Sequence, residues 1–192
     1  ETEDGALNAS VFGAKLSNLR MKGSYTNGEN QDATSTKVKL NEVRGNLNGR
    51  PFYATLALSR LDNPYISTTL NASVNLNDLP RIQQIPVRKQ PTGLVYVDVA
   101  FAGLIDHVKR RNTIDKLDIT GEVVFDSVSL SPNQLPIEIE NASGRIVLGD
   151  SSARIDSMRM LLNGQDLMVS AQFEKLFKYI AGSTPTFAVD AQ

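Results

Sequence analysis

The residues of this sequence that could do chemistry are few and scattered. The single histidine, His107, stands beside Lys109, Arg110 and Arg111 in the densest basic cluster of the chain. One imidazole does not supply the usual ligand set for a metal ion, and the chain has no cysteine to act as a thiolate. The cluster is either a site for an anionic headgroup or a partner's acidic patch, or a solvated connection between two strands. The second interpretation is favoured because charge runs are usually solvated.

Two pairs of carboxylates are the candidates for acid and base groups. Asp115 with Asp118, and Glu138 with Glu140, fall in turns or at the polar positions of alternating segments, which indicates solvated side chains. The chain has no Gly-x-Ser-x-Gly elbow, no glycine-rich loop between a strand and a helix, and no His-Glu-x-x-His. With one histidine and no cysteine, the choice of base and nucleophile is narrow. We therefore expect no enzymatic activity, no cofactor and no metal site.

Composition bounds the class of protein further. A chain of 192 residues is long enough for a single domain with a substantial core. Its 20 Lys and Arg residues balance 21 Asp and Glu residues, so it lacks the basic field that a phosphate backbone requires. Nucleic acid is therefore not an expected partner. The absence of cysteine fits the cytoplasm and a bacterial envelope equally well.

The segment from Val38 to Leu76 organises the rest of the chain. Apolar residues recur at every second position in successive parts of it, the period of a strand with one apolar and one polar side. The pair Asn48-Gly49 predicts a two-residue hairpin turn. The corner at Asp62, Asn63 and Pro64 predicts a second turn. These features together predict an antiparallel meander.

The same alternation continues to the end of the chain. It returns at Val95 to Phe101, at Leu117 to Phe125 and, after further turns, at Leu167 to Phe173. Its phase changes at Ser17 and Asn18 and again after Asp126, which predicts bulges. Asn163-Gly164 is a second hairpin signal, and Leu162-Asn163-Gly164 repeats Leu47-Asn48-Gly49, an echo too short to establish a repeat. Short helices are predicted at 77–85 and 173–181, and a last short strand within 184–192.

We therefore expect an all-β fold: an antiparallel meander of long strands curled into an open trough or half-barrel, with one or two short helices. An antiparallel sheet with one apolar face must fold back on itself, pair with a second sheet, or keep that face for a ligand. A closed sandwich or barrel thus remains the alternative to the open trough.

The order of residue types resembles the C-terminal region of the AsmA family of bacterial envelope proteins. The resemblance begins with Gly-x-Leu-x-Gly at residues 45–49, a strand with Leu56 and Leu58, and the corner Asp62 to Pro64. It continues through Val-Asn-Leu-Asn-Asp-Leu-Pro at residues 74–80 and the alternating segments at 119–123, 135–139, 144–148 and 161–167. It covers roughly the whole chain and contains no catalytic signature.

This resemblance implies a function and a location. AsmA-like proteins are usually long chains with a membrane anchor and a periplasmic body, so residues 1–192 are expected to be one β domain of a longer, membrane-anchored periplasmic protein. The family is associated with lipid transport and outer-membrane assembly, which implies a phospholipid or another acyl-chain ligand. The candidate lipid groove residues are Leu56, Leu58, Val97, Val99, Ile119, Val123 and Phe125. The alternative is a structural or protein-interaction β-sandwich module of the envelope, in which the apolar face is an ordinary core.

Overall fold

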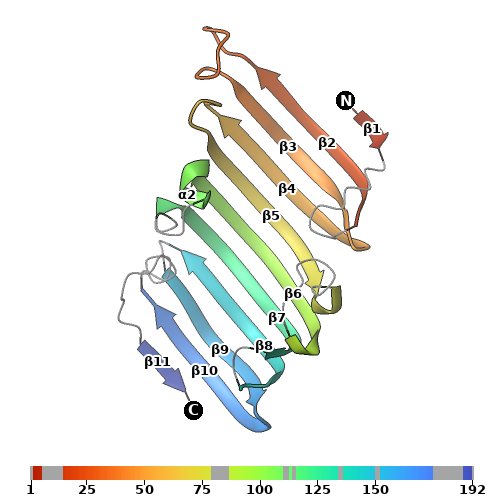
Figure 1. Cartoon of the computed structure of the whole chain (residues 1–192), viewed down its shortest axis with the longest axis vertical. Helices are drawn as coiled ribbons and strands as arrows, with labels where there is room; N and C mark the ends of the chain where they lie inside the picture. The colour runs from red at the N-terminus through yellow and green to blue at the C-terminus, as the bar shows by residue number, and fades with distance from the viewer. Residues whose placement is uncertain are drawn as a thin grey trace.

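The computed structural model describes residues 2–5, 15–78, 87–109, 113, 116–133, 136–149, 152–174 and 188–191. Within these residues, eleven strands form one antiparallel sheet in the order in which they occur in the sequence (Figure 1). The first six strands are β1 (Thr2–Gly5), β2 (Leu16–Thr26), β3 (Lys37–Leu47), β4 (Arg50–Ser59), β5 (Tyr65–Asn75) and β6 (Val87–Leu104). The others are β7 (Asp118–Pro132), β8 (Ile139–Gly149), β9 (Ser152–Leu162), β10 (Gln165–Phe173) and β11 (Ala188–Ala191).

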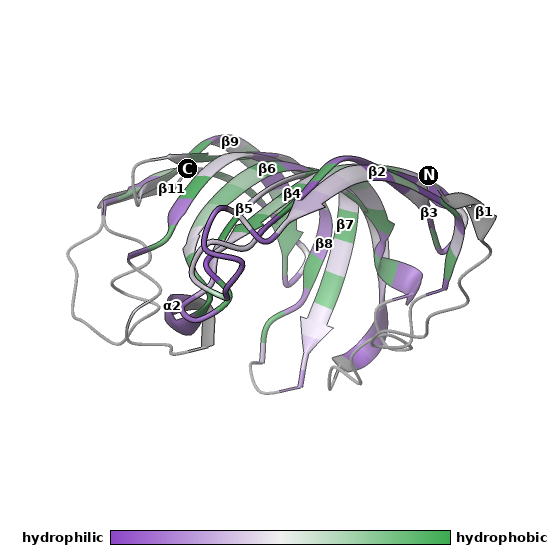
Figure 2. Cartoon of the chain, turned by 90° about the horizontal axis from the view of Figure 1, so that it is seen from above, coloured by the Kyte–Doolittle hydropathy of each residue, from purple (hydrophilic) through white to green (hydrophobic). Residues whose placement is uncertain are grey.

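The predicted all-β fold is confirmed. Strands β1 and β11 lie at opposite ends of the sheet, which is open rather than closed into a barrel. All eleven described strands belong to this one sheet, so the described part of the chain is not a two-sheet sandwich. Viewed along the length of the sheet, the strands are bowed (Figure 2).

Two short helices are described, η1 (Leu76–Asp78) and α2 (Ile105–Lys109). Residues 79–86 and 175–187 lie outside the described residues, so the predicted helices at 77–85 and 173–181 fall mostly there. Helix α2 lies in the predicted connection around His107, between β6 and β7, and was not predicted, because a helix of five residues leaves too short a pattern to recognise. Leu117 also differs from its prediction: it precedes β7 and is buried, only 3% exposed.

Both predicted Asn-Gly turns are two-residue hairpins. Asn48 and Gly49 have φ angles of 49° and 81°, between β3 and β4. Asn163 and Gly164 have φ angles of 52° and 78°, between β9 and β10. Positive φ at both central residues is what a turn matched to the strand twist requires, and asparagine and glycine tolerate it best.

Both changes of phase in the sequence are bulges in the structure. In β2, Asn18 has φ of 53°, and the register with β3 shifts between Ser17 and Arg20. In β7, Ser127 has φ of 52°, and the register with β8 shifts between Phe125 and Val128. Each bulge inserts one residue, so the apolar side chains after it return to the same face.

The register of the first five strands recurs in the last five. Thr2 pairs with Met21, and Gly5 pairs with Leu19. The residues 123 positions later pair in the same way: Phe125 with Gly144, and Val128 with Ala142. Strands β2 and β3 pair as β8 and β9 do, with the same two bulges; for example, the pairs Met21–Val43, Gly23–Leu40 and Tyr25–Val38 correspond to Gly144–Met158, Ile146–Ile155 and Leu148–Ala153. The short echo around the two turns is therefore part of a structural repeat, in which the five strands β7 to β11 take the places of β1 to β5.

Candidate functional site

One side of the sheet is lined by apolar residues in rows that run from strand to strand. Two rows of directly opposed residues cross the eight strands from β3 to β10. The first row is Val43, Ala54, Leu70, Val99, Gly121, Leu148, Ala153 and Phe173. The second row is Gly45, Phe52, Ala72, Val97, Val123, Ile146, Ile155 and Ala171. We call the side of the sheet that carries these rows the apolar face.

Three further rows extend the apolar face along the strands. They are Val38, Leu58, Ile66 and Gly103; Leu40, Leu56, Thr68, Phe101 and Ile119; and Val74, Val95, Phe125, Gly144, Met158 and Val169. The five rows contain no charged side chain, and Thr68 is their one polar residue. Its Oγ1 donates a hydrogen bond to the carbonyl of Thr55 at 2.6 Å, so its polarity is satisfied within the sheet.

All seven predicted groove residues lie on this face. Leu56 and Leu58 come from β4, Val97 and Val99 from β6, and Ile119, Val123 and Phe125 from β7. Val97 is directly opposite Val123, and Val99 is opposite Gly121. The structure thus brings the seven together in the central part of the sheet; that they contact lipid stays a prediction.

The large side chains of the apolar face remain partly accessible to solvent. All seven predicted groove residues are half-buried, and Leu70 is 37% exposed. The buried residues of the five rows are three alanines, Gly103 and one large side chain, Met158, which is 8% exposed; the alanines are Ala72, Ala153 and Ala171. A side chain in an ordinary core is almost fully excluded from water. No second layer of described residues therefore covers the centre of this face.

Short segments cover both ends of the apolar face. At one end, Leu76 of η1 is buried against Val128 and Ala142, with Val95 and Phe125 beside them. At the other end, Leu117 packs over Gly103, where a Cβ atom would lie 2.5 Å from Leu117 Cδ2. Helix α2, which precedes Leu117, lies on the inner side of the bowed sheet (Figure 2). The apolar face is therefore the concave one.

The opposite, convex face is polar. Thr55 and Thr69 share a hydrogen bond of 2.7 Å between their hydroxyls across β4 and β5. Arg145 of β8 lies 3.5 Å from Glu122 and 3.4 Å from Asp156, and Arg154 lies 2.7 Å from Asp156. These ion pairs are exposed, so each contributes little to stability. They place charge on the side of the sheet away from the apolar face.

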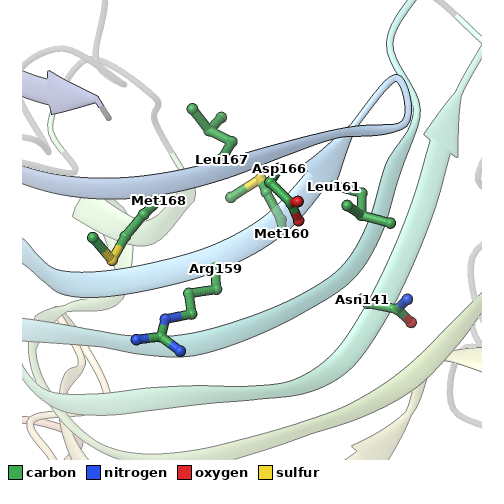
Figure 3. Close-up of a pocket in the computed structure, with 7 residues that line it drawn as sticks. All are labelled: Asn141, Arg159, Met160, Leu161, Asp166, Leu167 and Met168. Carbon is green, nitrogen blue, oxygen red and sulfur yellow. The ribbon is translucent and has the colours of Figure 1, made fainter.

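A recess lies beside the bulge of β8 (Figure 3). It has a volume of about 530 Å³, and its residues come from β8, β9 and β10: Asn141, Arg159, Met160, Leu161, Asp166, Leu167 and Met168. A second recess beside the bulge of β2 is lined by the corresponding residues of the repeat, among them Asn18, Arg44, Phe52 and Tyr53. Asp166 and Met168 of the first recess correspond to Pro51 and Tyr53 of the second. The bulge therefore produces a recess in both halves of the sheet, but the two recesses do not share the side chains that would bind the same ligand.

Two titratable groups with shifted pKa values lie away from the apolar face. Hydrogen bonds from Thr34 and from the hydroxyl and backbone N–H of Ser35 lower the pKa of Asp32, in the loop between β2 and β3. The Glu138 carboxylate raises the pKa of Lys89. Among the described residues, no group of three His, Cys, Asp or Glu could hold a metal ion. No helix in the described ranges is long and apolar enough to cross a membrane.

Sequence reasoning missed several features of this site. Gly121 sits in the middle of the groove with φ of 128°, where a Cβ atom would lie 2.1 Å from the carbonyl oxygen of Asp98. A glycine inside a strand pattern signals such a close backbone approach. Leu76 and Leu117, which cover the two ends of the apolar face, left no such signal, because each is one apolar residue in an irregular segment.

Comparison with known protein families, curated proteins and solved structures finds no match.

Proposed function

We propose that this protein holds the acyl chains of lipids on its apolar face and takes part in lipid transport or outer-membrane assembly in a bacterial envelope. The observation that carries the proposal is the apolar face itself: five rows without a charge, on one sheet, with most of the large side chains still partly accessible to solvent. Acyl chains need a continuous apolar lining, and each methylene that they bury contributes about 0.8 kcal/mol.

The dimensions of the face support a lipid of ordinary length. Eight neighbouring strands about 4.8 Å apart span roughly 34 Å. One acyl chain extends through about half of a hydrocarbon core of roughly 30 Å, or about 15 Å. The face is therefore longer than one acyl chain. Its open side allows a charged headgroup to stay in water, which avoids the cost of burying a charge.

The envelope location rests on the resemblance to AsmA-like proteins. The periplasm, a membrane anchor outside this segment, and a phospholipid as the ligand are all parts of the same proposal. A non-enzymatic role is part of the same proposal; it is supported by the five rows of the apolar face, which contain no titratable side chain.

The deciding experiment is native mass spectrometry of the protein purified from bacterial membranes and from the periplasmic fraction, with lipid extraction in parallel. We expect adducts with the mass of phospholipids that disappear after extraction with organic solvent. A lipid-free protein that instead copurifies with a stoichiometric protein partner would contradict the proposal and support an interaction module. Purification after mixing with lipid vesicles controls for lipid lost during the preparation.

A further inference from the structure

The recess beside the bulge of β2 differs in charge from its counterpart beside the bulge of β8. Both recesses contain an arginine at the same place in the repeat, Arg44 and Arg159. The recess beside β8 also contains the acid Asp166, whereas the recess beside β2 has Pro51 there and a second arginine, Arg20. We call the recess beside β2 the arginine recess. It has a volume of about 630 Å³, and the described residues that line it include no acid.

The arginine recess lies on the polar face of the sheet. Arg44, Tyr53 and Asn71 are directly opposed on β3, β4 and β5, and Arg20 of β2 stands opposite Arg44. Each of these four residues is next in sequence to a residue of the apolar face, so the alternation of a strand directs them to the other side. Two guanidinium groups, a phenol ring and an amide therefore stand in one row across four strands.

The Tyr53 ring is anchored at its hydroxyl end. The register of β3 with β4 shifts at residues 40–43, and the Tyr53 hydroxyl donates a hydrogen bond to the carbonyl of Asn41 at 3.2 Å. In the other half of the sheet, Ser170 makes this contact with the corresponding carbonyl, that of Asp156, at 2.6 Å. Tyr53 is nevertheless 45% exposed. An anchored aromatic ring thus borders the recess and is accessible to a ligand.

Arg44 can bind an anion without losing its present ion pair. Its Nε lies 3.0 Å from Glu42 Oε1, and its side chain is 51% exposed. The terminal nitrogens of a guanidinium group also carry N–H groups, and a carboxylate or phosphate accepts two of them as a bidentate pair. Glu42 itself does not line the recess.

The uncharged residues of the arginine recess favour a sugar over a bare anion. The amides of Asn46 and Asn71 each offer two donors and one acceptor, which match the hydroxyls of a sugar ring. The apolar C–H face of a sugar ring packs on an aromatic ring such as that of Tyr53. The counterpart recess has Leu161 and Met168 in place of Asn46 and Tyr53, so it lacks both kinds of contact.

We propose that the arginine recess binds an acidic saccharide, a sugar ring that carries a carboxylate or a phosphate group. Arg44 binds the anionic group, and Arg20 adds positive charge beside it. Tyr53 packs on the sugar ring, and Asn46 and Asn71 bond its hydroxyls. A few polar groups that converge on one recess in this way fix the orientation of a small ligand. This inference is independent of what the apolar face binds.

The test is an NMR titration of the whole protein with glucuronate and with glucose 6-phosphate, and with glucose and inorganic phosphate for comparison. We expect saturable shifts of the backbone amides of Asn46, Tyr53 and Asn71 with at least one of the two acidic sugars. Glucose lacks the anion and inorganic phosphate lacks the ring, so each should bind about ten-fold more weakly. The acidic sugar that binds more tightly identifies the preferred anionic group.

Three variants separate the contributions of the side chains. Arg44→Gln should weaken binding of the acidic sugar about ten-fold, because it removes the charged hydrogen bonds. Tyr53→Met introduces the residue of the counterpart recess and should weaken binding about two- to ten-fold through loss of the ring. Arg159→Gln is the matched control, since it makes the same change at the corresponding place in the repeat. It should leave binding unchanged, and the amide spectrum of each variant reports whether it is folded.

The proposal is overturned if neither acidic sugar shifts the amides of the recess, or if the shifts map to another surface. It is also overturned if Arg159→Gln weakens binding as much as Arg44→Gln does. Inorganic phosphate that binds as tightly as the acidic sugars would overturn the saccharide and leave only an anion site.

Discussion

Asn48 and Asn163 tie their hairpins to a third strand through the same two hydrogen bonds. The N–H of Asn48 donates to the carbonyl of Lys15 at 2.8 Å, and the N–H of Lys15 donates to Asn48 Oδ1 at 2.8 Å. Asn163 makes the corresponding pair of bonds with Glu138, both at 2.8 Å. Lys15 and Glu138 immediately precede β2 and β8. One residue type thus provides the positive φ of the turn and the contact that holds the neighbouring strand.

Loss of this contact should weaken both halves of the sheet. Asn48→Gly and Asn163→Gly keep a residue that tolerates positive φ, so each removes mainly one hydrogen bond, worth about 0.5–1.5 kcal/mol. Urea denaturation should show a lower free energy of unfolding for each variant. The double variant should show the sum of the two decreases, because the sites are far apart. Gln165→Ala, an exposed change next to the second turn, is the control. Unchanged midpoints would show that the side-chain bonds do not form in solution.

The glycines of the two turns should resist substitution for conformational reasons alone. A Cβ atom at Gly49 or Gly164 meets nothing within 4 Å, yet φ is 81° and 78°. Gly49→Val and Gly164→Val should each lower the free energy of unfolding by about 1–2 kcal/mol, the cost of left-handed backbone for an ordinary residue. Gly149 also has open space around it but lacks positive φ, so Gly149→Val should change stability little. Equal effects at all three positions would contradict this explanation.

Replacing Ile119 by aspartate tests whether the apolar face is accessible to water. Ile119 is half-buried opposite Phe101, so a carboxylate there should remain hydrated and the protein should stay folded. Bound lipid should decrease, because the charge interrupts the apolar lining. Thr120→Asp, at the next and exposed position, should leave lipid occupancy unchanged.

The measurements for Ile119 are the urea midpoint and the lipid content by mass spectrometry. In a closed core the unpaired carboxylate would cost several kcal/mol, comparable with the stability of a whole domain. Unfolding of Ile119→Asp, with Thr120→Asp intact, would therefore argue for a covered face. A folded Ile119→Asp protein with normal lipid content would remove Ile119 from the groove.

Acid should loosen the loop between β2 and β3 at a pH below the usual range for aspartate. Hydrogen bonds from Thr34 and Ser35 lower the pKa of Asp32 from 3.8. Since the folded-state pKa is depressed, Asp32 stabilises the loop at pH values above its ordinary pKa, and the stabilisation is lost as pH falls through the lowered one. An NMR titration of the Ser35 amide should report this transition below pH 3.8. Thr34→Val should move it upward; a midpoint at or above the ordinary value in the parent would contradict the hydrogen bonding.

Much of the fold could be predicted because the sequence features that determine it are local. Asn48-Gly49 and Asn163-Gly164 specify turns by backbone preference, and alternation specifies which side chains share a face. The bulge at Asn18 was visible as a change of phase. The repeat was not predictable, because few corresponding residues of the paired strands are identical; Arg44 and Arg159 are one such identical pair. The exposure of the apolar face was not predictable either, since alternation is the same whether a second layer covers it or not.

The linear pairing order of the strands determines how the molecule unfolds under force. Each of the described strands is hydrogen-bonded only to the described strands before and after it in the sequence. The sheet is therefore a one-dimensional array in which the loss of an end strand removes one interface and leaves the rest intact. When the protein is pulled from its termini in an optical trap, the force–extension curve should show a series of small steps, as strands detach one after another from the edges. A domain with a central core would instead unfold in a single step.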